Sequence, residues 1–150
     1  MNALRMHFYL VRPQLSWALA GHTDIQMRYD PAIEPPASAW LALSEDQRIA
    51  LAERFHRDDD SSTPNIRVHA ALHATIEAQI AMKLPNVVDA ITRLRAEGLD
   101  RHDAIHAIAS VLAERMWHAL RRDPAPLDPN AEYVAALDKL TAASWRRRYG

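Results

Sequence analysis

Two pairs of histidines stand four residues apart, one in the segment VHAALHATIEAQ and one in the segment RHDAIHAIASVLAE. The pairs are His69 with His73 and His102 with His106. On a helix, residues four apart lie on the same face, one turn apart. A His-x3-His pair on one helical face is an arrangement that offers two nitrogen ligands to a metal ion. Metal binding is therefore the chemistry that these residues suggest.

Other residues extend this pattern. Glu77 follows His73 by four residues, so His69, His73 and Glu77 form one stripe along a helix. We expect Glu77 to act as a metal ligand or as the general base beside a metal-bound water. His56 lies seven residues after Ile49 on the same helical face. If it converges with the other four histidines, a two-metal centre is favoured. By contrast, His118 points elsewhere on its helix and is expected in solvent.

The elements that carry these residues are predicted to be helices. No stretch alternates between apolar and polar residues over the length of a strand, so the fold class is all-α. After a short helix at 37–43, the chain is divided into five main helices that form a compact bundle. They cover about 45–56, 64–83, 87–97, 101–122 and a final stretch from 129 onward.

Residues suited to helix ends set these boundaries. Side chains that accept a hydrogen bond from a free backbone N–H favour the N-cap position, and proline favours the first helical turn. Ser44 also forms a capping box with Gln47. Gly98 is suited to the left-handed position after a helix. The expected N-caps are Ser44, Thr63, Asn86, Asp100 and Asp128.

Topology should bring the histidines together. Short connections make successive helices antiparallel, so the helices at 64–83 and 101–122 are expected to be roughly parallel. Each carries its histidine pair in its first two turns. The four imidazoles then face one interior space at the same end of the bundle.

Buried imidazoles need partners, because an unsatisfied buried polar group costs about 1 to 3 kcal/mol. A metal ion is one partner. A hydrogen-bond network between histidines and carboxylates is a second, and unrelated surface histidines are the third interpretation. The chain has no cysteine, so thiolate sites are excluded. For a divalent metal bound by imidazole and carboxylate we expect zinc, with iron, manganese or nickel as alternatives.

The segments NIRVHAALHATIEAQIA and EGLDRHDAIHAIASVLAERMW resemble a small family of bacterial proteins known as a domain of unknown function. Its members share two helices of the forms His-x3-His-x3-Glu-x-Gln and Arg-His-x3-His. The stretch that begins with YDP at residue 29 also resembles the start of those proteins. The resemblance covers about 27–120. It implies a helical fold and a suspected metal site, with no assigned activity.

Residues 1–26 have neither a clean helical period nor a capping pattern. We interpret them as an N-terminal extension that is disordered or lies outside the true start at Met27. Residues 27–150 are then a single helical domain. This boundary is a hypothesis about the gene.

Charge and hydropathy narrow the function classes. The chain carries 18 Lys and Arg against 19 Asp and Glu, a formal charge of −1, so no global field draws it to nucleic acid or to an anionic membrane. Its N-terminal apolar runs are too short for an export signal or a membrane span. We expect a cytoplasmic protein without a nucleic-acid or membrane partner. Other partners are unknown, and a homo-oligomer stays open.

Two functions remain. One is a metal-dependent hydrolase in which His69, His73, His102 and His106 bind one or two ions and metal-bound water is the nucleophile. The chain has no HExxH motif, nucleophile elbow or phosphate loop. The alternative is a non-catalytic interaction or adaptor module, whose histidines are structural or hydrogen-bonded and whose contact residues are Trp117, Trp145 and Tyr149.

Overall fold

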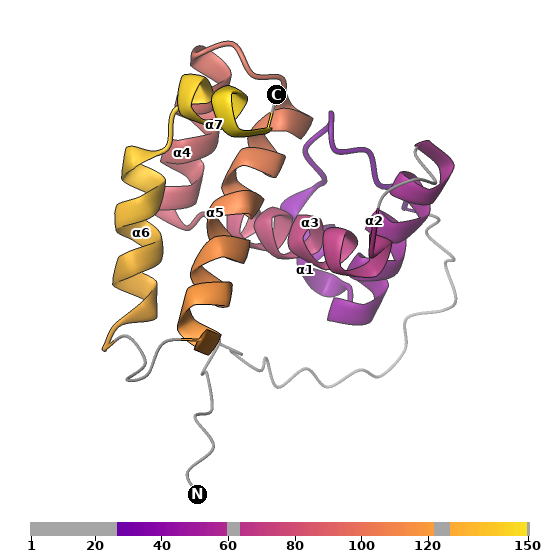
Figure 1. Cartoon of the computed structure of the whole chain (residues 1–150). Coiled ribbons are helices and arrows are strands. Elements are labelled where there is room, and N and C mark those ends of the chain that lie inside the picture. The colour runs from indigo at the N-terminus through magenta and orange to yellow at the C-terminus, as the bar shows by residue number, and fades with distance from the viewer. Residues whose placement is uncertain (1–26, 60–63, 122–126, 150) are drawn as a thin grey trace, which may run out of the picture.

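A computed structural model describes residues 27–59, 64–121 and 127–149. Within these ranges the chain forms helices and no strand, which confirms the all-α prediction (Figure 1). In these ranges there are seven helices: the short helix predicted at 37–43, the five main helices and one further helix at the C-terminal end. They are α1 (Ala37–Ala42), α2 (Glu45–Asp59), α3 (Ile66–Ala81), α4 (Pro85–Ala96), α5 (Arg101–Arg121), α6 (Pro129–Lys139) and α7 (Ala142–Tyr149).

Helix α7 was not predicted as a separate element. Between α6 and α7, Thr141 and Ser144 form a reciprocal cap. The Thr141 N–H donates to Ser144 Oγ and the Ser144 N–H donates to Thr141 Oγ1, both at 3.1 Å. This is the geometry of a capping box, with serine at its last position. The Thr-x-x-Ser pattern was therefore a local signal for a new helix.

Three of the predicted caps are confirmed. Ser44 and Gln47 bond reciprocally at the start of α2. The carboxylate of Asp100 accepts from the Asp103 N–H at 2.8 Å, and that of Asp128 accepts from the Ala131 N–H at 2.9 Å. The cap at Asp100 fixes the first turn of α5, which carries His102 and, one turn later, His106.

Two other boundaries differ from the prediction. Helix α3 begins at Ile66, because Asn65 adopts a left-handed conformation (φ 52°) that a helix interior does not allow. The predicted cap Thr63 lies outside the described residues. Helix α4 begins at Pro85 with Leu84 as its N-cap, so Asn86 lies inside the first turn. Proline at the first helical position explains this shift, because it has no N–H to leave unpaired.

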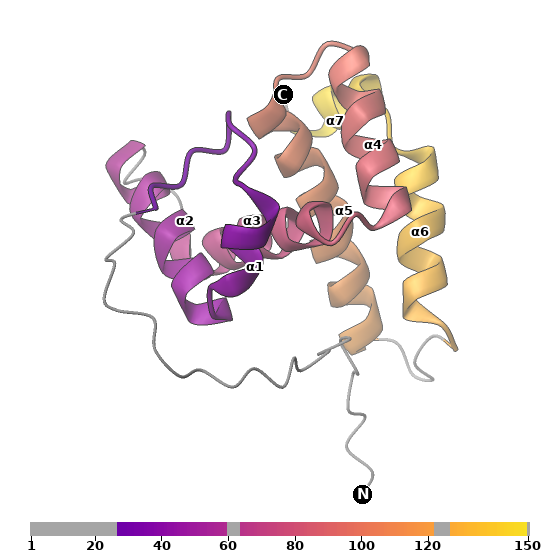
Figure 2. The ribbon, with the colours of Figure 1, turned by 180° about the vertical axis from the view of Figure 1, so that it is seen from behind.

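The two helices that carry the histidine pairs are not parallel, contrary to the prediction. Helix α3 lies across α5 in both views of the ribbon (Figures 1 and 2). Lys83, directly after α3, is left-handed (φ 56°), as is common where a helix ends and the chain changes direction. The N-terminal halves of α3 and α5 still meet, because the two helices cross.

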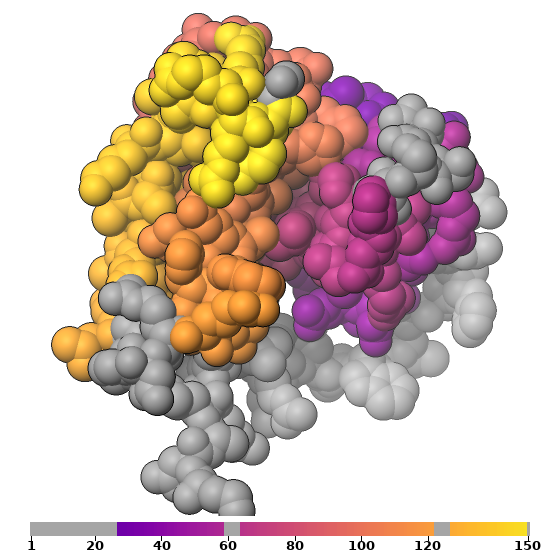
Figure 3. Space-filling model, in the orientation of Figure 1, coloured from indigo at the N-terminus to yellow at the C-terminus, as the bar shows by residue number. Residues whose placement is uncertain are grey.

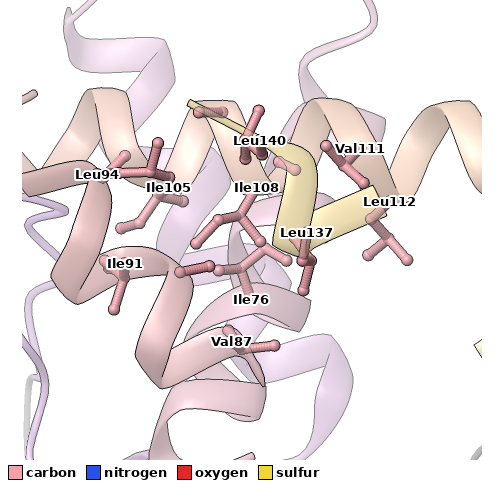
Figure 4. Close-up of a cluster of buried hydrophobic side chains, with 14 of the residues drawn as sticks. Ile76, Val87, Ile91, Leu94, Ile105, Ile108, Val111, Leu112, Leu137 and Leu140 are labelled. Atoms are coloured by element: carbon pink, nitrogen blue, oxygen red, sulfur yellow. The ribbon is translucent and has the colours of Figure 1, made fainter. Parts of the chain in front are cut away.

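Helix α3 separates two hydrophobic clusters. The first cluster joins Ile76 and Ile80 of α3 to α4, α5, α6 and the start of α7 (Figure 4). The second joins the alanines of α3 to Tyr29, to Trp40 of α1 and to α2. Small side chains allow α2 to approach α3 closely. Helix α3 is consequently buried on more than one face, as a central helix should be. Its buried residues are Ala70, His73, Ala74, Ile76, Glu77, Ala78 and Ile80.

On the surface, α5 and α6 lie side by side with α7 packed beside the N-terminal part of α5 (Figure 3). The aromatic residues suggested as contact residues differ in exposure. Trp117 and Tyr149 are more than half exposed, whereas Trp145 packs partly buried against the first cluster. Among the helices in the described ranges, none has the length and apolar character needed to cross a bilayer.

Candidate metal centre

Five imidazole rings converge where α2, α3 and α5 meet. In nine of their ring pairs the centroids are 4.3 to 6.3 Å apart. The two predicted pairs therefore face each other, and the fifth ring from α2 joins them. The five residues are His56, His69, His73, His102 and His106.

Two groups of three nitrogens are close enough to suggest a metal site. One group is His56, His73 and His102, and the other is His69, His73 and His106; within each, the candidate ligand atoms lie within 4.8 Å of one another. Tetrahedral ligands at zinc–nitrogen distances near 2.1 Å are about 3.4 Å apart. Small ring rotations would therefore close either group around an ion. His73 belongs to both.

Burial and mutual repulsion favour the neutral form of four of these rings. Burial, together with the nearby rings of His69 and His102, lowers the pKa of His56 to about 4. Burial and the same two rings lower the pKa of His106 to about 3. Burial likewise lowers the pKa of His73 and of His69. Neutral imidazole is the form that binds a metal, so proton competition at neutral pH is weak.

Three buried ring nitrogens in the cluster have no hydrogen-bond partner in the part of the chain that the structure describes. They are the buried Nε2 atoms of His56, His73 and His106. Buried polar atoms are nearly always paired, and each exception needs an explanation. A network of hydrogen bonds between histidines and carboxylates does not satisfy these three atoms among the described residues. A metal ion would, since the Nε2 of a neutral imidazole that carries its proton on Nδ1 has a lone pair directed away from the ring.

The tautomer of His73 is set by its neighbour Tyr29. The Tyr29 hydroxyl donates to Glu77 Oε1 at 3.1 Å and lies 3.0 Å from His73 Nδ1. A hydroxyl has a single proton, so the oxygen of Tyr29 must accept from His73 Nδ1–H. Nε2 of His73 is then unprotonated and has its lone pair free for a ligand bond. This is the outer-shell arrangement that orients metal-binding histidines.

Glu77 lies in a buried ion pair. Both of its oxygens accept from Arg101, at 2.7 Å and 2.6 Å, and neither group of candidate ligands includes it. Burial raises the pKa of Glu77, whereas the Arg101 guanidinium and the Tyr29 hydroxyl oppose this. Glu77 accepts two hydrogen bonds from Arg101 and one from Tyr29, as an ionised carboxylate does. Arg101 also donates to the Pro31 carbonyl at 2.8 Å.

Tyr29 and Arg101 are site residues that the sequence analysis did not identify as such. They bond to α3 residues 44 and 24 positions away along the chain, so helical spacing gives no sign of them. A signal was nevertheless present. Tyr29 belongs to the YDP stretch and Arg101 to the Arg-His-x3-His pattern. His118 is about half exposed and 3.7 Å from Glu114, as expected for a residue outside the site.

A cleft of about 1040 Å³ reaches the cluster from outside. It lies between α4 and the segment before α1, and His102 and Phe55 contribute to its wall. His69, His102 and His106 are only partly buried, whereas His56 and His73 are almost fully buried. The cluster is therefore closed on one side and accessible on the other.

A family model described as "Domain of unknown function (DUF1841)" matches residues 39–139. The matched region contains all five histidines, Glu77 and Arg101, while Tyr29 precedes it. No curated protein and no solved structure matches the chain. Function must therefore be argued from the side chains of the cluster.

Proposed function

We propose that this protein, which belongs to the DUF1841 family of unknown function, binds a divalent metal ion in the cluster of five histidines. The observation that supports the proposal most directly is the set of three buried Nε2 atoms without hydrogen-bond partners, on His56, His73 and His106. They come from three helices and belong to rings whose centroids are 4.3 to 6.3 Å apart. Convergence of a fifth ring favours a centre with room for two ions.

The donor set favours a borderline metal. Imidazole nitrogens without thiolates suit zinc, iron or nickel, whereas manganese prefers more oxygen ligands. We propose zinc, with iron, manganese and nickel as alternatives. His73 can hold only one ion at a time, because its Nδ1 is bonded to Tyr29. In a centre with two ions, the second ion would therefore be bound by other rings.

The reaction that such a site supports is hydrolysis. An ion bound by three imidazoles has a coordination position left for water, and the ion lowers the pKa of that water. The cleft at His102 would give a substrate access. Because Glu77 is paired with Arg101, we assign it the positioning of His73 through Tyr29 in place of the expected roles of ligand or general base.

The alternative is a structural ion that only joins α2, α3 and α5. Purely structural zinc sites usually contain cysteine and have four protein ligands, and neither group here contains cysteine. Hydrolysis of an activated ester by zinc-loaded protein separates the two roles. A catalytic centre gives turnover that is lost in His106→Ala, whereas a structural ion gives no turnover above that of the metal-free protein.

The decisive experiment is metal analysis of protein purified without an affinity tag. We expect stoichiometric metal in the wild type and strong depletion in His73→Ala and in His106→Ala. His118→Ala is the matched control, because this histidine lies on the same helix as His106 but is about half exposed and outside the cluster. Equal trace levels in all four proteins, before and after incubation with zinc, would refute the metal site.

A further inference from the structure

Among the described residues, the two groups of candidate metal ligands consist of imidazoles alone. The Tyr29 hydroxyl donates its proton to Glu77 Oε1 at 3.1 Å. The carboxylate of Glu77 is connected to the cluster by hydrogen bonds through Tyr29. The guanidinium of Arg101 compensates its charge at 2.6 Å. A divalent ion bound here would keep its full charge of about +2.

Such a charge needs a counter-ion. A buried charge without a partner of opposite sign is strongly disfavoured, because the low dielectric around it no longer screens it. Metal sites that contain a ligating Asp or Glu supply the counter-charge from the chain itself. Neither group of candidate ligands among the described residues contains a carboxylate, so these groups leave the counter-charge to a ligand bound from solution.

The carboxylates that line the cleft belong to neither group of candidate ligands. Asp30 and Asp100 line the cleft, but their side chains accept hydrogen bonds from the backbone N–H groups of Ala32 and Asp103. Both carboxylates thus stabilise turns and caps at the ends of the segments around the cleft. The cleft wall at His102 and the partial exposure of His69 leave a path by which a small ligand can reach the rings.

We infer that the metal centre takes an anionic oxygen ligand from solution, either hydroxide or the oxyanion group of a small substrate. This inference rests on the proposed metal site and specifies its ligand class. The position left by three imidazoles would bind that anion, and the net charge of the centre would fall to about +1. A neutral substrate alone would leave the charge uncompensated.

The test uses the full chain loaded with Co²⁺, whose visible absorption bands report both its binding and its ligands. Sodium azide serves as the anionic probe. We expect saturable azide-dependent changes in the cobalt bands. Competition by acetate or phosphate would identify an oxyanion site, whereas azide binding without such competition would identify a site for hydroxide. Cobalt bands that do not respond to azide would overturn the anion inference and leave the metal site standing.

Failure of the metal site itself has a different readout, because no cobalt bands would form and both proposals would be refuted.

A charge variant sharpens the test. His69→Glu places a carboxylate in one of the two groups and should weaken azide binding on the order of tenfold, equivalent to about 1.4 kcal/mol. His118→Glu adds the same charge outside the cluster and should bind azide like the wild type. A cobalt-loaded His69→Glu protein with unchanged azide affinity would contradict the charge argument.

Discussion

Tyr29 and His73, 44 positions apart in the chain, meet at 3.0 Å through the hydroxyl of one and Nδ1 of the other. This contact joins the segment before α1 to the central helix. It determines which nitrogen of His73 is available for a ligand, because the hydroxyl proton is already donated to Glu77. Tyr29 therefore acts on the site through His73.

Replacement of Tyr29 by Phe should weaken metal binding without removing a ligand. The His73 ring would lose the acceptor that fixes its tautomer, and loss of such outer-shell partners lowers metal affinity about 10- to 100-fold. Zinc affinity by competition with a chromophoric chelator measures this effect. ¹⁵N chemical shifts of the His73 ring in metal-free protein report the tautomer directly.

Tyr133→Phe is the matched control for this substitution. Tyr133 is also buried and donates its hydroxyl proton to a residue of α3, Gln79, at 3.0 Å, but it lies outside the cluster. The Tyr133→Phe substitution should leave zinc affinity and the His73 tautomer unchanged. An unaltered tautomer in Tyr29→Phe would show that Tyr29 does not position the ring.

The ion pair of Glu77 and Arg101 should be sensitive to removal of one partner alone. Glu77→Gln leaves a buried guanidinium uncompensated and is expected to lower the free energy of unfolding by about 3 to 5 kcal/mol. The double variant Glu77→Leu with Arg101→Leu removes both charges and should be less destabilised. Urea denaturation of the metal-free proteins measures the free energy of unfolding of the single and the double variant.

An exposed ion pair provides the comparison. Glu114→Gln breaks the contact of Glu114 with Arg148, 3.2 Å apart and partly exposed, and should cost at most about 1 kcal/mol. If Glu77→Gln were no more destabilising than Glu114→Gln, the buried pair would not have the structural role assigned to it.

The metal-free protein should lose stability as the pH falls from about 6.5 toward 4. The pKa of His56 is lowered to about 4 and that of His106 to about 3, whereas histidine in an unfolded chain has a pKa near 6.5. Over this window the unfolded chain binds protons that the folded chain does not, which favours unfolding. Above the window these groups are neutral in both states and contribute no pH dependence.

Denaturant unfolding in the presence of a chelator, at a series of pH values, checks this expectation. His106→Leu removes one of the groups and should reduce the pH dependence, while His118→Ala should retain the full dependence. A stability that stays constant across the window in the wild type would mean that the buried rings are protonated in the folded protein.

Added zinc should stabilise the folded protein in proportion to its binding. At a free zinc concentration about 100 times the Kd, binding to the native state alone adds about 2.7 kcal/mol. Thermal unfolding with and without chelator should show this gain in the wild type and in His118→Ala. His73→Ala should show none, because it removes the residue common to both groups.

The histidine spacing predicted which imidazoles share a helical face, because it depends only on local geometry. Residues four apart share a helical face wherever the helix lies, so the pairs on α3 and α5 faced inward even though the two helices cross and are not parallel. The connection after α3 contains the left-handed Lys83, a residue type that gives little warning of such a conformation. The sequence pattern therefore could not predict how the two helices are oriented relative to each other.

The hydrogen bonds of Tyr29, Glu77 and Arg101 around the cluster could not be predicted from the sequence pattern either. Glu77 follows His73 by one turn, which suggested a ligand, but its partner is decided by Arg101 at the start of another helix. A helical stripe shows which side chains share a face and says nothing of what packs against it. The contact between Tyr29 and His73 likewise depends on the tertiary fold alone.

The position of α3 between two hydrophobic clusters has a consequence for local opening. Its alanines complete one cluster and Ile76 and Ile80 complete the other, so neither cluster can separate from the rest without exposing this helix. Its central amides should therefore exchange with deuterium only through global unfolding, more slowly than those of α7. An ion held by α2, α3 and α5 would slow that exchange further, and the deuterium pattern would show whether both halves of the molecule respond together.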